Sequence, residues 1–314
     1  MGGNALSVRA RGLGRNLLRS VALSFLMLVS GPNAAPQSAN PPEIQGHETT
    51  PETFLDLTPA ELAKEVPELK HLKPAQSQDM LPLILERVGA AVADFFDNFS
   101  NTTSAEHILF TIESRKLEQP LHYEATFDYL ALVKPGTDKT RLQEYRTDSK
   151  GKQVKVRGTV VTAGFVTLPA YFHPDYQRGS RFRYLGRDVV KGQSTYVVAF
   201  VQRPGVARQA GWVEFDDKAA LVLARGVAWI DPARFRILRL RTDIQQPDLN
   251  VGLQRETTEV EYSEVTFKQG GKTLWLPRDV TVSGQLNQYT FHNQHRYSDY
   301  RLFIVQTGEK QKNP

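Results

Sequence analysis

The sequence predicts an α+β fold, in which one N-terminal helix packs as a lid on a large, curved antiparallel sheet of about eleven or twelve strands. Two observations lead to this prediction. From about residue 106 onwards, short β-rich stretches follow one another, separated by Gly, Pro or Lys-Gly turns. A single long stretch with helical periodicity precedes them. Consecutive strands without long helices between them favour a meander that is closed or nearly closed.

The N-terminal residues predict export. Basic residues precede an apolar run, and small residues and prolines follow it: Arg9, Arg11, Arg15 and Arg19, then 21–29, then 30–36. This order is typical of a secretory signal peptide, with cleavage between Gly31 and Ala39. The apolar run is shorter than the roughly 20 residues of a membrane span, although an uncleaved N-terminal anchor stays the alternative. We expect a signal peptide at 1–35 and a soluble periplasmic or secreted protein without a stable membrane anchor.

Charge and composition exclude several classes of function. The chain carries 39 basic and 34 acidic residues, a net charge of +5. Four of the basic residues are the arginines of the predicted signal peptide and would be lost when it is cleaved. A mature chain with a net charge close to +1 does not support nucleic-acid binding. The chain has no cysteine, which excludes disulfides, thiol nucleophiles and thiolate metal sites. The core alone must therefore stabilise the exported chain.

Residues 36–78 are rich in Pro, Gln, Asn, Thr and Glu and poor in large apolar side chains. Such a segment buries too little apolar surface to offset the entropy of ordering, which predicts a flexible linker. One short helix interrupts it. Thr58 suits the N-cap, Pro59 the first helical position and Glu61 the acidic position of a capping box. Pro67 ends this helix.

The first long helix spans about 79–99. Apolar residues recur there at spacings of three and four and form one broad face: Leu81, Ile84, Leu85, Val88, Val92, Phe95, Phe96 and Phe99. The polar residues 98–103 end the helix. Because this apolar face needs a partner, we expect it to cover the sheet, with Phe95, Phe96 and Phe99 as the lid residues.

The predicted strands then follow in one domain, 79–307, which ends in a disordered tail at 308–314. They span about 106–114, 121–134, 140–148, 152–163, 181–190, 193–202, 209–215, 221–230, 235–245, 255–269, 273–283 and 287–306. The segment 168–177 does not fit a strand and is predicted to be a short helix or a loop. Several strands, such as 197–200, have apolar residues at both odd and even positions, which indicates burial on both faces.

The familiar catalytic and metal-binding motifs are missing. His292 and His295 form the only close histidine pair, and residues three apart on a strand face opposite sides, so the two cannot chelate one ion. No Gly-x-Ser-x-Gly elbow, phosphate loop or dinucleotide fingerprint occurs. Glu259, Glu261 and Glu264 belong to a charged strand, which a solvated face explains. We therefore expect no enzyme, no metal and no cofactor.

Arginines are frequent in the central hairpin. Arg181, Arg183 and Arg187 share one parity and would form a basic stripe on one face of a strand. The solvated face of a half-buried sheet explains such a stripe. The alternative is a rim that meets an anionic head group or an acidic partner.

The interior of the predicted sheet has two interpretations. A concave sheet covered by the helix would enclose an apolar cavity, but side chains also fill many small barrels. We expect Trp229, Phe235 and Ile237 to line this interior opposite the lid residues.

Two stretches carry a family resemblance. The hairpin Tyr-Leu-Gly…Val-x-Lys-Gly-x-x-x-Tyr-Val-Val at 184–198, and Val-x-Trp-Ile-Asp-Pro-x-x-Phe-x-Ile-Leu-Arg at 227–239, resemble the periplasmic LolA/LolB-like lipoprotein carrier superfamily. Leu-Trp-Leu-Pro at 274–277 fits the same pattern. The resemblance implies an unclosed antiparallel barrel over about 79–307, with a helical lid above an apolar cavity. This chain is longer than the carriers, and no cavity arginine of theirs is matched.

Two functions stay open on this basis. The first, which the resemblance favours, is a non-enzymatic periplasmic binding or carrier module for an acyl chain or a lipoprotein-like apolar ligand. The second is an envelope protein that contacts, senses or scaffolds a protein partner and whose barrel is filled by its own side chains. A bulky apolar concavity would favour the first function, and a filled interior the second.

Overall fold

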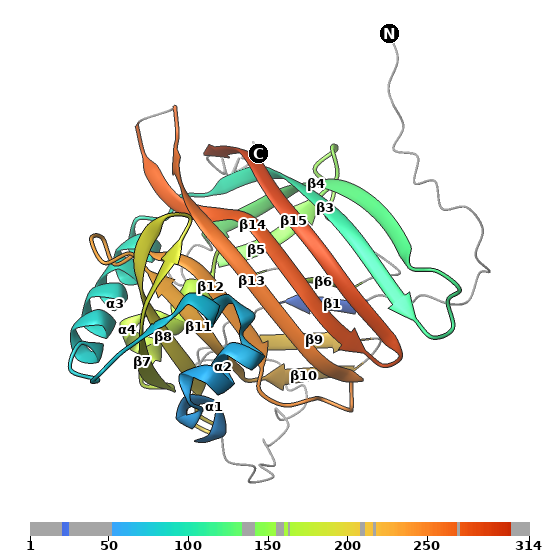
Figure 1. The fold of residues 1–314 in the computed structure, drawn as a ribbon. Coiled ribbons are helices and arrows are strands. Elements are labelled where there is room, and N and C mark those ends of the chain that lie inside the picture. Colours follow the sequence, from blue (N-terminus) through green and yellow to red (C-terminus); the bar gives the residue numbers. More distant parts are fainter. Residues whose placement is uncertain are drawn as a thin grey trace, which may run out of the picture.

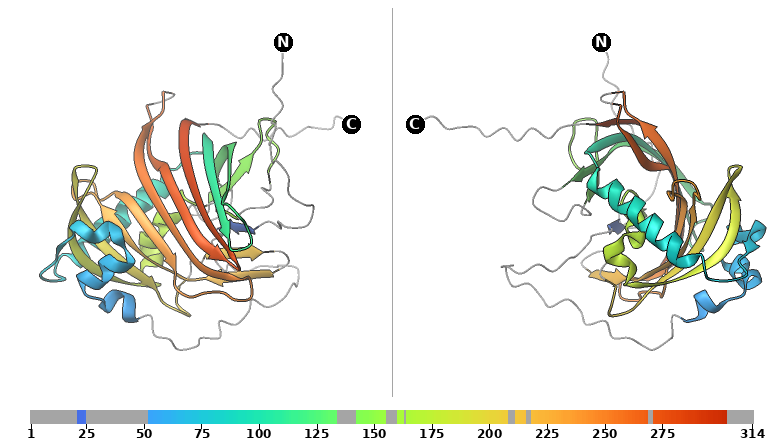
Figure 2. Two further views of the ribbon diagram at one scale, coloured as in Figure 1. Left: turned by 45° about the vertical axis from the view of Figure 1, so that its right-hand side comes forward. Right: turned by 90° about the vertical axis from the view of Figure 1, so that its left-hand side faces the viewer.

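The computed structural model describes residues 21–24, 52–133, 142–154, 160–162, 164–207, 211–215, 218–268 and 271–302. The predicted tail and most of the predicted signal peptide lie outside these residues. The main element is an eleven-stranded antiparallel sheet that curves without closing, since β2 and β5 form its two edges (Figures 1 and 2). The predicted fold class, a large unclosed antiparallel sheet with few helices, is confirmed.

The strands of the main sheet are neighbours mostly in chain order. In space they run β2 (Lys73–Pro74), β7 (Ser180–Val190), β8 (Gln193–Gln202), β11 (Ala224–Ile230), β12 (Ile237–Ile244), β13 (Leu253–Thr266), β14 (Thr273–Leu286), β15 (Tyr289–Leu302), β3 (Thr102–Ser114), β4 (Leu121–Val133) and β5 (Leu142–Thr147). The chain thus places its first long strands beyond its last one. Residue pairs far apart in the sequence, such as Glu106 and Tyr297, become direct cross-strand neighbours.

A smaller sheet of four strands lies beside the main one. It runs β10 (Lys218–Val222), β9 (Gly211–Phe215), β1 (Val21–Ser24) and β6 (Val160–Thr162). The backbone of β1 comes from the apolar run of the predicted signal peptide and pairs antiparallel with β9 and parallel with β6. The signal peptide itself stays a prediction.

Two groups of helices cover different sides of the main sheet (Figure 2). On the outer side lie α1 (Glu52–Asp56), α2 (Pro59–Glu65) and the 3-10 helix η1 (Pro67–His71). On the concave side lie α3 (Leu81–Asp97), the 3-10 helix η2 (Leu168–Phe172) and α4 (Pro174–Gln177). The predicted helix at 79–99 and the break in strand structure at 168–177 are both present. α3 contacts η2, α4 and β7, and its action as a lid stays a prediction.

Part of the predicted linker is packed rather than loose. The capping box forms as expected, because the Thr58 hydroxyl accepts a hydrogen bond from Glu61 N and Thr58 N donates to Glu61 Oε2. Leu62 and Val66 are then fully buried together with Phe54. Amino-acid composition underestimated how well ordered this segment is, because its few apolar residues share one buried face. We call residues 52–72 the outer strap; the predicted domain boundaries stay a prediction.

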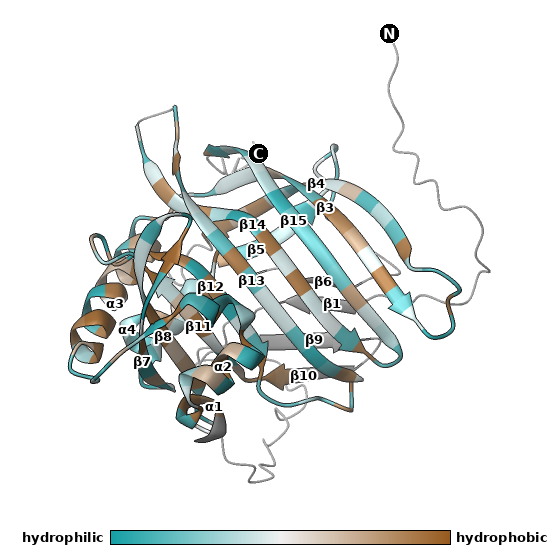
Figure 3. Ribbon diagram, viewed as in Figure 1, coloured by the Kyte–Doolittle hydropathy of each residue, from teal (hydrophilic) through white to brown (hydrophobic). Residues whose placement is uncertain are grey.

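The outer strap buries the outer face of three strands. The apolar side chains beneath it alternate along β8 and β11: Val197, Ala199, Val201, Val227 and Trp229. Arg183 adds two hydrogen bonds of 2.6 Å to the carbonyl oxygens of Leu55 and Leu57. The strands β7, β8 and β11 are therefore buried on both faces, whereas β13, β14, β15 and β3 alternate between polar and apolar residues (Figure 3).

Removal of one strap side chain should test this packing. Leu62→Ala is expected to lower the free energy of unfolding by about 2–5 kcal/mol, because it leaves a cavity in a fully buried position. Lys64→Ala, on the exposed face of the same helix, should change it by no more than about 0.5 kcal/mol. Equal effects of the two substitutions in urea denaturation would show that the strap does not dock in solution.

Candidate functional site

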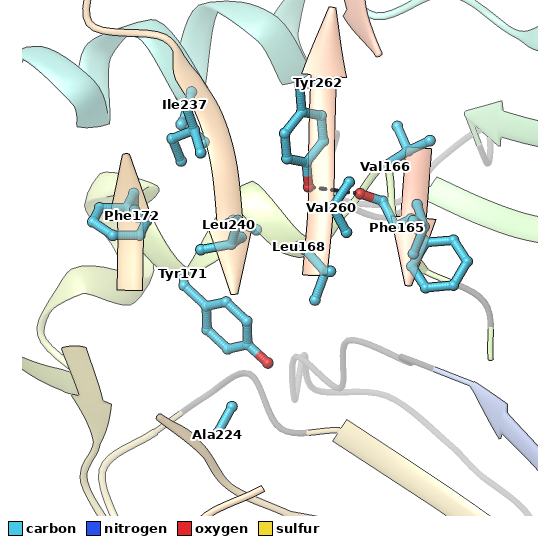
Figure 4. Close-up of a cluster of buried hydrophobic side chains, with 14 of the residues drawn as sticks. Phe165, Val166, Leu168, Tyr171, Phe172, Ala224, Ile237, Leu240, Val260 and Tyr262 are labelled. Atoms are coloured by element: carbon cyan, nitrogen blue, oxygen red, sulfur yellow. Dashed lines mark hydrogen bonds between the residues drawn. The ribbon is translucent and has the colours of Figure 1, made fainter. Parts of the chain in front are cut away.

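The concave side of the sheet is filled by a segment of the chain itself. We call residues 164–177 the inner segment. Its large side chains are buried against inward-facing residues of β8, β12 and β13: Phe165, Val166, Leu168, Tyr171, Phe172 and Tyr176 (Figure 4). Ring contacts hold the inner segment against the sheet, such as that of Tyr171 with Phe200 at 5.0 Å between centroids. The filled interior that the sequence left open as one interpretation is present in the described part of the chain.

Buried polar side chains anchor the start of the inner segment. The Glu144 carboxylate accepts hydrogen bonds of 3.0 Å from Val166 N and Thr167 N, and one of 2.5 Å from the Tyr129 hydroxyl. The Tyr262 hydroxyl donates to Phe165 O at 2.9 Å (Figure 4). Burial raises the pKa of Glu144 in spite of these donors. The backbone of a buried segment needs such partners, so this set fixes where the segment lies.

The other end of the inner segment is joined to α3. Gln177 Nε2 donates hydrogen bonds of 2.8 Å to Leu85 O and to Phe172 O. A Cβ added at Gly89 would lie only 2.7 Å from that nitrogen, so glycine permits the close approach of helix and segment. α3 and the inner segment therefore form one packed unit.

A second buried polar cluster lies on β3, β5 and β15. Glu106 receives two hydrogen bonds from Arg146, of 2.5 and 2.7 Å, one from the Tyr297 hydroxyl at 2.6 Å, and contacts His295 Nδ1 at 2.9 Å. Burial alone would raise the pKa of Glu106, but Arg146 and His295 outweigh it and hold the pKa at about 2. Burial lowers the pKa of His295. With all four side chains buried, the cluster holds strands together rather than meeting a substrate.

This cluster was not predicted from the sequence. Its members occupy inward-facing positions of strands that alternate between polar and apolar residues. An apolar residue is the norm at such positions, so polar residues there are the signal that could have revealed the cluster. The histidine pair behaves as predicted. His295 faces the interior, whereas His292 faces outwards and contacts the Ser283 hydroxyl at 2.7 Å.

Glu256 is a buried carboxyl group without a full set of partners. Its Oε2 atom has no hydrogen-bond partner, and its other oxygen accepts only a 3.5 Å contact from the Thr258 hydroxyl. Burial raises its pKa to about 8, and its proximity raises the pKa of Tyr171 further. Burial therefore favours the uncharged form of Glu256.

A solvent-facing groove stays open between α3 and the β12–β14 part of the sheet. Its cavity volume is about 100 Å³, against roughly 300–1,000 Å³ for typical ligand pockets. The apolar lining comes mainly from Phe95, Phe235, Ile237, Leu274 and Trp275. Asp94, Arg236 and Lys272 stand at its polar side. The groove thus combines aromatic walls with a charged margin.

Phe235 is held at the groove by a strained turn. The Asp231 carboxylate accepts hydrogen bonds from Ala233 N and Arg234 N, and Phe235 N donates to Asp231 O at 2.8 Å. The turn places Phe235 at φ 55°, in the left-handed region that bulky residues rarely adopt. Its ring stacks on that of Tyr196, at 6.1 Å between centroids. The Asp-Pro-x-x-Phe pattern therefore positions one aromatic ring at the rim.

The structure brings together three of the six residues predicted to bind a ligand. Phe95, Phe235 and Ile237 line the groove. Phe96, on α3, and Phe99, just after it, are buried in the inner core. Trp229 lies on the opposite face, under the outer strap, where its Nε1 donates to Asp188 at 3.2 Å.

The predicted arginine stripe does not form on one face. A β-bulge between Tyr184 and Gly186 shifts the register, so Arg187 is paired with Tyr196 and stacks on its ring at 4.8 Å. Arg181 and Arg183 face the opposite, outer side, where they pair with Val201 and Ala199. The stripe was predicted because residues two apart on a regular strand share a face. The bulge adds one residue to the strand, so Arg187 faces the side opposite to Arg181 and Arg183.

The described residues contain neither a metal-binding cluster nor a membrane-spanning helix. Within the described ranges, no group of three or more His, Asp or Glu side chains converges as metal ligands would. No described helix combines the length and the apolar character that a membrane crossing requires.

Comparison with known proteins gives only distant likenesses. No protein-family model matches the chain, and no curated protein matches it. A domain described as an outer membrane lipoprotein-sorting protein, from Vibrio parahaemolyticus, is 13% identical, with 72% of this chain and 94% of that chain covered and a TM-score of 0.39. A DUF1329 family protein from Desulfovibrio piger is 10% identical, with 73% and 95% covered and a TM-score of 0.37.

A third solved structure belongs to the superfamily that the hairpin motif resembles. A LolA superfamily protein from Nitrosomonas europaea is 11% identical, with 72% of this chain and 94% of that chain covered and a TM-score of 0.30. With TM-scores below 0.5, these likenesses decide nothing about what this chain binds.

Replacement of Glu256 by an uncharged amide should reveal its raised pKa. Only the folded state carries the raised pKa, so the native protein loses stability as the pH rises from 4.5 to about 8. Glu256→Gln removes this loss. Its stability relative to the native protein should therefore increase over that range, by up to a few kcal/mol, and then stay constant.

Thermal unfolding across the pH range measures this difference. Glu113→Gln, which replaces an exposed carboxylate at the end of β3, is the control and should show little effect at any pH. A difference between Glu256→Gln and the native protein that does not change with pH would mean that Glu256 is solvated in the folded state.

Proposed function

We propose that this protein is a non-enzymatic binding module of the bacterial envelope and that its groove receives the end of an acyl chain or a similar apolar group. The supporting observation is the strained Phe235, whose ring the Asp231 turn holds at a groove walled by Phe95 and Trp275. Strain of this kind persists only where the surrounding structure imposes it, and it concentrates at functional positions. Trp275 is fixed in turn by a 2.6 Å hydrogen bond from its Nε1 to Ile237 O.

The charged groups at the groove favour binding over catalysis. Asp94 accepts a hydrogen bond from the Asn98 amide, and Arg236 pairs with Glu264 at 2.9 Å. Lys272 Nζ donates to Ser100 Oγ at 2.5 Å and also to Asn98 O. These groups are engaged in holding the walls, and none stands as an acid next to a base. The margin can orient a ligand but offers no proton-transfer pair.

The size of the groove limits the ligand. A volume of about 100 Å³ admits the end of a chain and not a whole acyl chain. A longer insertion requires α3 to move away from β14, and Lys272 is the side chain that joins the end of the helix to that strand. We therefore propose partial insertion in this conformation.

The filled interior supports a second candidate function. Because the inner segment takes the space of a lipid cavity, the groove would equally suit one apolar side chain of a protein partner in the envelope. In that case the protein acts as a sensor or scaffold. The two functions share the groove and differ in the class of molecule that enters it.

Filling the groove should abolish uptake of an apolar chain. Ala91 lines the groove on α3, so Ala91→Phe places a ring in it, whereas Ala90→Phe places the same ring on the exposed side of the helix. We expect native mass spectrometry to show a bound medium-chain fatty acid on the native protein and on Ala90→Phe, but not on Ala91→Phe. No adduct on any of the three proteins would reject acyl binding and favour the protein-partner function.

Tryptophan fluorescence should locate the bound chain. A fatty acid brominated near its methyl end quenches an indole that it contacts, and Trp275 lines the groove while Trp229 lies under the outer strap. Saturable quenching should therefore be lost in Trp275→Phe and kept in Trp229→Phe. The reverse result would place the apolar site on the outer face of the sheet.

A further inference from the structure

One corner of the main sheet carries arginines without carboxylate partners. Many other arginines of the sheet and its turns are matched: Arg225 with Glu65, Arg234 and Arg236 with Glu264, Arg239 with Glu261, Arg241 with Glu68, Asp243 and Glu259, Arg278 with Glu261 and Asp279, and Arg296 with Asp279. Arg255 and Arg301 are exposed single arginines of β13 and β15 without such a pair among the described residues. Arg178, Arg181 and Arg203 are exposed and form no ion pair with any carboxylate of the described residues. Three such arginines close together make the corner a local excess of positive charge.

The fold brings these three arginines together. Arg181 lies opposite Val201 in the β7–β8 ladder, so Arg203, two residues further, is its diagonal neighbour on the same face, about 7–8 Å away. Arg203 Nη1 donates to Arg178 O at 3.4 Å, and Arg203 N donates to Gly179 O at 2.8 Å. Gly179 permits this approach, because an added Cβ would lie 2.9 Å from Ala207 Cα. The backbone positions of the three arginines are thus close neighbours.

An apolar tip stands beside them. The turn after β8 exposes Pro204 and Val206, and 43% of the surface of Val206 is accessible to solvent. Asp175, the acidic residue closest in sequence to Arg178, lies 3.8 Å from His173 and not against the arginines. Like charges without partners repel one another, so their retention at one corner favours an anionic partner.

We propose that this corner, Arg178, Arg181 and Arg203 with the 203–207 turn, docks on the anionic surface of a phospholipid membrane. Exposed cations next to a small apolar tip suit the lipid interface, where the charges meet phosphate groups and the tip enters the head-group region. The Arg guanidinium binds phosphate in a bidentate manner. This docking is independent of the groove, because none of its residues lines it.

Flotation of the purified protein with lipid vesicles tests this surface. We expect binding to vesicles of phosphatidylglycerol mixed with phosphatidylcholine, no binding to pure phosphatidylcholine, and loss of binding in high salt. The triple variant R178Q/R181Q/R203Q should lose on the order of a hundredfold in partition, since each cation near an anionic surface contributes separately.

The matched control is R115Q/K116Q/K150Q, which removes the same charge from exposed turns after β3 and β5. It should bind as the native protein does. An equal loss in both triple variants would mean that net charge rather than this corner drives binding. Absence of binding to anionic vesicles in low salt would overturn the proposal and turn the search to an acidic protein. Unfolding temperatures of all variants exclude loss of fold as the cause.

Discussion

The burial of the inner segment against the concave face of the sheet is the interaction on which the rest of the structure depends. An open, strongly curved sheet presents apolar side chains such as Leu240 and Val260 that need cover, and the aromatic residues of 164–177 provide it. A buried irregular segment also needs partners for its backbone, and Glu144 and Tyr262 supply them. The position of α3 follows, because Gln177 and Gly89 join the helix to this segment.

The groove is a consequence of the same packing. The inner segment contributes Pro169 to the groove wall, and α3 contributes Phe95, while the Asp231 turn brings Phe235 from the sheet. Where the inner segment fills the interior, a small apolar opening of about 100 Å³ stays beside α3. The proposed binding therefore involves the rim, where aromatic rings and charged side chains meet, and not the volume of the interior.

Burial on both faces explains how the outer side is organised. Under the outer strap, odd-numbered residues of β8 and β11 form one core, while even-numbered residues such as Val198 and Ile230 belong to the other. The outer face of the sheet also carries a network of ion pairs centred on Arg241 and Glu261, which reaches the strap at Glu68. The three neighbouring arginines next to the 203–207 turn do not take part in this network.

Local patterns predicted much of the fold. The three-and-four spacing in 81–99 produced α3, the Thr58 capping box produced α2, and the alternating stretches produced most strands within a few residues. Predictions that assumed strict alternation of faces along a whole strand were less secure, since one bulge at Tyr184 moved Arg187 to the other face. Predictions from average composition also failed for the outer strap, where a few apolar residues at the right spacing were enough to dock it.

The sequence by itself determined the fold class, the apolar face of α3, the exclusion of thiol chemistry and the opposite orientation of His292 and His295. These properties depend on residue type and on short-range periodicity. Only the tertiary structure decided that the interior is filled, that Phe95, Phe235 and Ile237 share a groove, and that Glu106 meets His295, 189 residues away. Such contacts depend on strand order and register between distant segments, and a single chain's local pattern does not specify either.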